Sequence, residues 1–121
     1  MIGTCWGSYP VVRLSMFDTI SAGVSMHPSH PILMATAGDD EAEVLGLIKS
    51  PQLFLVEGGA VDSVKTGGLS KNVLGDKLTA VEFPVMTHGW TVRGNLEDPD
   101  VARDVEKAKE LVLHLFGEIL K

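Results

Sequence analysis

One short segment, residues 51–56, is almost entirely apolar, and this limits the kind of sheet that the chain can build. A strand with one face in water alternates apolar and polar residues, whereas an unbroken apolar run indicates a strand covered on both faces. Strand-like runs at residues 22–26 and 79–83 are separated from this segment by stretches with helical signals. The alternation predicts an α/β fold, with three or four mainly parallel strands and helices on both faces of the sheet.

The expected helices are marked by their first residues. Asp98 and Pro99 are a typical cap and first position for a helix, and apolar residues recur at helical spacing from 101 to 119. A shorter helix is expected to begin at Asp39 or Asp40 and to reach about residue 48. The two prolines of residues 27–31 predict a rigid loop there.

Length, charge and cysteine content exclude several classes of function. The chain has 121 residues, enough for one domain, and 10 basic against 16 acidic residues give it a net charge of −6. An acidic chain without a basic stripe is poorly suited to nucleic acid or to an anionic membrane surface. With a single cysteine it has no internal disulfide and no multi-cysteine metal site, and we expect a reducing, cytoplasmic setting without export.

The first candidate for chemistry is Cys5, which has Gly3 two residues before it and Gly7 two residues after it. This spacing is typical of a nucleophile elbow, a sharp strand-to-helix turn in which a side chain on either glycine would crowd the nucleophile. The backbone N–H of Trp6 would then help to hold an oxyanion. The alternative is a buried cysteine in a glycine-rich turn.

His88 lies beyond the third apolar run and before the last helix, where an α/β-hydrolase carries its general base. The alternative is an ordinary loop histidine stacked on Trp90. For the acid, we expect Asp62, in the loop after residues 51–56. Glu57 precedes the glycines of that loop, and Asp39 and Asp40 fit helix caps better.

Three further residues are candidates for binding substrate: His27, Trp90 and Arg93. Arg93 could hold an anionic carboxylate, although a solvated arginine is the simpler interpretation. His27 and His30 are three residues apart without a nearby carboxylate, which makes them loop residues lining a pocket rather than metal ligands. The sequence contains no dinucleotide fingerprint, phosphate loop or zinc-helix motif, and we expect no metal and no cofactor.

The chain resembles the dienelactone hydrolase (carboxymethylenebutenolidase) family of the α/β-hydrolase superfamily. The residues that carry the resemblance lie at 3–7, 27–29, 62–68 and 99–104, and above all at 88–94. The resemblance implies a Cys-Asp-His triad without a cofactor, in which Cys5 is the nucleophile and His88 the base. It also implies cleavage of an ester or lactone of a small carboxylated molecule.

The resemblance departs from the family pattern at two places. The triad acid of the family follows its strand more closely, where this chain has Gly58, Gly59 and Ala60, so the acid is either Asp62 or absent. The elbow of the family lies near mid-chain, so residues 1–121 correspond to one N-terminally incomplete domain. We therefore expect an exposed sheet edge that invites a second copy, with Val11, Val12, Leu14 and Phe17 in water. The alternative function is an inactive member, or a binding or interaction domain on the same fold.

Overall fold

Four strands form one parallel sheet in the computed structural model, which describes residues 1–121. The strands are β1 (Ile2–Thr4), β2 (Gly23–Met26), β3 (Gln52–Glu57) and β4 (Leu78–Phe83). They lie side by side in the order β1-β2-β3-β4, and each neighbouring pair is parallel. The predicted α/β class is confirmed, and the three apolar runs of the sequence form β2, β3 and β4.

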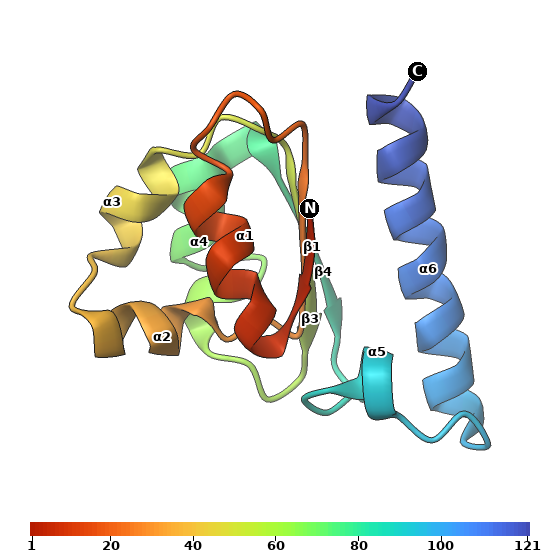
Figure 1. The fold of residues 1–121 in the computed structure, drawn as a ribbon. Helices are drawn as coiled ribbons and strands as arrows, with labels where there is room; N and C mark the ends of the chain where they lie inside the picture. The colour runs from red at the N-terminus through yellow and green to blue at the C-terminus, as the bar shows by residue number, and fades with distance from the viewer.

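Helices cover both faces of this sheet (Figure 1). One face carries α1 (Ser8–Leu14), α2 (His30–Ala37), α3 (Glu41–Gly46) and α4 (Leu69–Leu74). The other face carries α5 (Trp90–Arg93) and α6 (Pro99–Ile119). Three single turns of 3₁₀ helix complete the chain: η1 (Cys5–Gly7), η2 (Asp62–Val64) and η3 (Gly75–Lys77). None of these helices combines the length and the apolar character needed to cross a membrane.

Two of the predicted helix starts are confirmed by their caps. A side-chain oxygen of Asp40 accepts a hydrogen bond of 2.9 Å from the Glu43 N–H, and Asp98 accepts one of 2.9 Å from the Asp100 N–H. These bonds satisfy backbone donors that a helix start leaves without partners.

The prediction of a loop over residues 27–31 is wrong in part, because α2 begins at His30. Pro31 lies in the first turn of that helix, where a missing N–H removes no helical hydrogen bond. The prolines therefore define a helix start rather than an extended loop.

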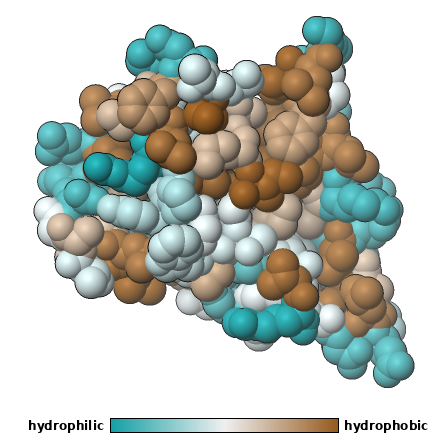
Figure 2. Space-filling view, in the orientation of Figure 1, coloured by the Kyte–Doolittle hydropathy of each residue, from teal (hydrophilic) through white to brown (hydrophobic).

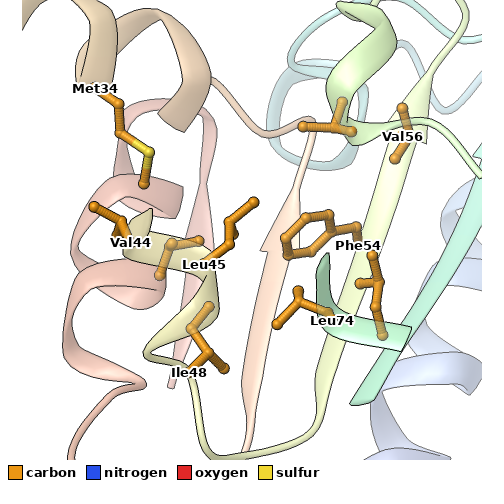
Figure 3. Packing of buried hydrophobic residues seen from close by; sticks show 10 residues of the cluster. Met34, Val44, Leu45, Ile48, Phe54, Val56 and Leu74 are labelled. Carbon is orange, nitrogen blue, oxygen red and sulfur yellow. The ribbon is translucent and has the colours of Figure 1, made fainter. Parts of the chain in front are cut away.

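The side chains of β3 divide between two hydrophobic clusters, one on each face of the sheet. All six residues of the strand are buried, as the apolar run predicts. Phe54 and Val56 join Val12 and other residues beneath α1–α4 (Figure 3). Leu53 and Leu55 lie in the cluster beneath α5 and α6. The middle of the sheet is thus covered on both faces and can hold residues at its end in fixed positions.

Unlike β3, the strand β1 lies at an edge of the sheet and has only one neighbouring strand. Ile2, Leu14 and Phe17 are exposed, and Figure 2 shows apolar surface gathered between α1 and α6 on this face. The expectation that Val11 and Val12 lie in water is wrong, because α1 packs against β2, α2 and α3 and buries both side chains. The apolar surface at this edge is therefore smaller than the sequence predicts.

Candidate active site

The turn after β1 has the geometry of a nucleophile elbow. Cys5 has a φ of 53°, in the left-handed region that non-glycine residues rarely adopt. A Cβ on Gly3 would overlap the carbonyl oxygen of Gly7, whereas a Cβ on Gly7 would meet no heavy atom within 4 Å. The turn therefore requires a glycine before the cysteine but not after it, which corrects the expectation that both positions exclude a side chain.

Ser8 fixes this turn to the segment that follows β2. Its buried hydroxyl donates a hydrogen bond of 2.8 Å to the Cys5 carbonyl and accepts bonds of 3.0 Å from the N–H groups of Ser29 and His30. The Ser29 N–H also bonds to the Cys5 carbonyl, at 3.3 Å. The backbone carbonyl of the strained cysteine is thus held by both the Ser8 hydroxyl and the Ser29 N–H.

His88 and Cys5 lie at the same, carboxyl end of the sheet and are in contact. The His88 Nε2 is 2.8 Å from the Cys5 Sγ, although 83 residues separate them in the sequence. The loop that carries His88 approaches the end of β3 closely: the Gly58 N–H donates to the Met86 carbonyl, and a Cβ on Gly58 would overlap the Pro84 carbonyl oxygen. Gly58 thus lets the His88 loop lie against β3.

The acid behind His88 is Glu57, the last residue of β3. Its Oε1 is 2.9 Å from the Nδ1 of His88, and the residue is only 5% exposed. The expected acid, Asp62, has a fully exposed side chain paired with Lys65 and does not contact His88. Asp62 lies five residues beyond Glu57, in η2, where its side chain is in solvent. The structure therefore brings together Cys5, His88 and Glu57.

The missed acid had a signal in the sequence. Glu57 ends a strand whose other residues are buried, and a carboxylate seldom follows an unbroken apolar run unless it has a partner. Preference for the last residue of a buried strand over an aspartate in the following loop would have identified Glu57.

Hydrogen bonds within this group favour the charged forms of both Cys5 and His88. The contact with His88 is the largest cause that lowers the pKa of the Cys5 thiol below 9.0, while burial opposes it. The bond to Glu57, followed by the contact with Cys5, raises the pKa of His88 above 6.5. The two shifts together favour a thiolate beside an imidazolium, which is the reactive form of a cysteine nucleophile.

Two other groups approach the sulfur. The Trp6 backbone N–H contributes a hydrogen bond that lowers the pKa of Cys5, while the Trp6 side chain is exposed. The Ser29 hydroxyl lies 3.6 Å from the Cys5 Sγ. The Trp6 N–H therefore reaches the sulfur, while its role as an oxyanion donor stays a prediction, and Ser29 is a contact that the sequence analysis did not find.

The three predicted substrate-binding residues have different positions. Arg93 is exposed and lines a hollow of about 400 Å³ that His88 also borders. Trp90 lies beneath that hollow and is buried against Phe83, with ring centroids 4.6 Å apart. His27 is completely buried, so its side chain is not open to a substrate. The prediction that His27 contacts substrate is therefore wrong.

Instead, His27 supports the ring of His88. Its Nε2 is hydrogen-bonded to the Thr91 hydroxyl at 2.7 Å, and its ring meets that of His88 edge-on at 5.1 Å between centroids. Burial lowers the pKa of His27 to about 4, so the side chain is neutral where His88 is charged. A neutral ring beside the imidazolium avoids a second positive charge in the site.

A second buried histidine, His30, makes acid stability a testable property. Burial lowers its pKa to about 3, and neither ring nitrogen has a hydrogen-bond partner. His27 and His30 both bind protons more weakly in the folded protein than in the unfolded chain. Their contribution to the stability of the fold is therefore present above the ordinary histidine pKa of 6.5 and is lost as the pH falls below it. Each histidine is expected to lower the free energy of unfolding by on the order of 2 kcal/mol when the pH falls from about 7 to about 5.

Urea unfolding at the two pH values measures this loss. His30→Phe, which keeps a flat ring against Phe54, is expected to remove about half of the combined loss because His27 remains. His114→Gln, at an exposed position of α6, is the control and should keep the full loss. Equal losses of stability by the unmodified protein and by His30→Phe between the two pH values would contradict the assignment of His30 as a buried neutral histidine.

Comparisons with protein-family models, with curated proteins and with solved structures found no match to this chain. The case for a function therefore depends on the geometry of the site itself.

Proposed function

We propose that the protein is a carboxylic-ester hydrolase with a Cys5–His88–Glu57 triad. The observation that carries the proposal is the continuous chain of contacts from Glu57 through both nitrogens of His88 to the Cys5 sulfur, at 2.9 and 2.8 Å. A nucleophile, a base within hydrogen-bond reach and an acid that orients the base are the parts of an acyl-transfer site.

The first half of the reaction forms a thioester. The Cys5 thiolate attacks the carbonyl carbon of the ester, and the electrons of the C=O bond move to the oxygen, which the Trp6 N–H helps to hold. When this intermediate collapses, the bond to the leaving oxygen breaks. The imidazolium of His88 gives its Nε2 proton to that oxygen, and an alcohol leaves.

The second half releases the acid. Neutral His88 takes a proton from water, and the resulting hydroxide attacks the thioester carbonyl. The C–S bond breaks, the carboxylic acid leaves, and thiolate and imidazolium are restored. Throughout, Glu57 accepts the Nδ1–H of His88, which keeps Nε2 directed at the sulfur and stabilises the positive ring.

Arg93 supports a substrate class like that of the dienelactone hydrolase family, in which esters or lactones carry a carboxylate. None of the structure's ion pairs includes Arg93. The two aspartates in the same hollow are occupied, because Asp98 caps α6 and Asp100 pairs with Arg103. A free guanidinium beside the base suits an anionic group. We place the reaction in a reducing, cytoplasmic setting, which keeps a lone thiol available.

Trapping the thioester tests the proposal directly. We expect an activated aryl ester to leave its acyl group on Cys5, seen as a mass increase of the intact protein that is lost in Cys5→Ala. Alkylation of Cys5 by iodoacetamide should persist at lower pH than that of an ordinary thiol, since the His88 contact lowers its pKa. Acylation at another residue, or an ordinary alkylation profile, would count against a catalytic Cys5.

The choice of acid gives a separate prediction. Glu57→Gln is expected to lower kcat by about 10²- to 10⁴-fold, because the amide no longer fixes the tautomer or the charge of His88. Asp62→Asn is the matched control, since its side chain lies in solvent, and it should leave kcat unchanged. Steady-state kinetics of both variants decide between Glu57 and Asp62. A large loss of kcat in Asp62→Asn with no loss in Glu57→Gln would restore Asp62 as the acid.

A further inference from the structure

A second hollow borders the site, and His88 is the one lining residue that it shares with the hollow of Arg93. It has a volume of about 310 Å³, and its walls include His88, Ser29 and Glu57. The Ser29 hydroxyl lies 3.6 Å and the His88 Nε2 lies 2.8 Å from the Cys5 sulfur, so two of the residues that line the hollow contact the reacting atom. A group attached to a carbonyl held at Cys5 can therefore extend into it.

The rest of this hollow is formed by apolar side chains from α2, the turn before it and the loop after β3. They are Pro28, Pro31, Ile32, Ala60 and Val61. Ile32 is 60% exposed and Val61 is 42% exposed, so both residues present apolar surface to water. We call this hollow the Ile32–Val61 pocket.

The charges around the Ile32–Val61 pocket define what it accepts. It contains no lysine or arginine, and its one carboxylate, Glu57, is buried against His88. The charged groups that border it, Glu57 and His88, are paired with each other, so a negative charge placed here would find no free cation. Anionic groups are thus directed to the Arg93 side, and uncharged apolar groups to this side.

We propose that the Ile32–Val61 pocket binds an uncharged aliphatic or aromatic group of the ester that Cys5 cleaves. Its volume lies at the lower end of the range of about 300–1,000 Å³ for small-molecule sites, which suits one medium-sized group. The inference rests on the proposed function, and it adds that substrates have an apolar portion. That portion belongs either to the acyl group or to the alcohol.

Two series of esters separate these sources. In one, 4-nitrophenyl esters lengthen from acetate to hexanoate; in the other, acetate esters carry a lengthening alcohol. We expect kcat/KM to rise in one of the series, by about fourfold for each buried methylene. A rise in the first assigns the pocket to the acyl group, and a rise in the second assigns it to the alcohol. Flat or falling values in both series would overturn the proposal.

Variants then connect the preference to this pocket. Ile32→Ala and Val61→Ala are expected to lower kcat/KM several-fold more for the longest favoured ester than for the shortest. Leu113→Ala is the matched control, because Leu113 is 61% exposed on α6 at the opposite face of the sheet. Equal effects of the two pocket variants on short and long esters would overturn the assignment.

A binding measurement keeps this inference distinct from the proposed function. Hexanamide, which has no ester bond, is expected to shift the methyl NMR signals of Ile32 and Val61, while acetamide shifts them much less. If no ester is hydrolysed but hexanamide shifts these signals, the hydrolase proposal fails and the apolar site stands. If short esters are hydrolysed through Cys5 and hexanamide leaves the signals unchanged, the pocket proposal alone fails.

Discussion

Replacing either Cys5 or His88 with alanine is expected to reduce ester hydrolysis to the rate of the uncatalysed reaction. The two side chains act as one unit, since the thiolate depends on the imidazolium 2.8 Å away. Loss of a nucleophile or its base in such a unit costs up to about 10⁶-fold in kcat. The double variant should therefore be no slower than either single variant.

Hydrolysis of an activated aryl ester by the purified variants measures this effect. His114→Ala is the control, because it removes an exposed histidine of α6 outside the site. Urea unfolding of each variant shows whether the fold is retained. Equal rates for the unmodified protein, Cys5→Ala and His88→Ala would assign the hydrolysis to another source and leave a binding or interaction domain as the remaining function.

The sheet and the last helix could be predicted because their signals are local. The β3 segment has no alternative to burial on both faces, and α6 is marked at its start by Asp98 and Pro99. By contrast, α2 was missed because prolines indicate a loop or a helix start equally well, depending on the residues that follow. Those residues, 32–37, have no strongly amphipathic pattern to decide the matter.

The site could be predicted in part for the same reason. Cys5 was found through the spacing of its glycines, and His88 through its place after the third apolar run. Glu57 was passed over because the sequence does not reveal how closely the next loop approaches. A side chain at position 58 would overlap the Pro84 carbonyl, so the glycine there allows the His88 loop to lie against β3, with His88 beside Glu57.

The burial of His27 and Val12 depends on similar long-range packing. His27 follows a strand directly, a position that often faces a ligand at the carboxyl end of a parallel sheet. Here Thr91 and the His88 ring cover it, and both come from a segment more than sixty residues away. Val12 is covered by helices that precede β3, so its burial does not require further strands beyond β1.

Gly3→Ala is expected to be the most destabilising single substitution in the elbow. The new Cβ would overlap the carbonyl of Gly7, a backbone group that cannot rotate away, and would lie 2.9 Å from a methyl of Val11. Forcing β1 away from the turn should cost about 3 kcal/mol or more of unfolding free energy. It should also separate Cys5 from His88, so that alkylation of the remaining thiol follows an ordinary pH profile.

Gly7→Ala is the matched comparison, because it adds the same methyl group to the other glycine of the elbow. Gly7 has helical dihedral angles, with φ −61° and ψ −15°, and its Cβ would face open space. The substitution should leave stability unchanged or raise it by about 0.4–1 kcal/mol, since alanine restricts the unfolded chain. Urea unfolding and alkylation of both variants test the pair. The reverse result, a damaging Gly7→Ala and a neutral Gly3→Ala, would contradict this structure of the turn. It would mean that β1 does not approach the start of α1 as closely as the position of Cys5 requires.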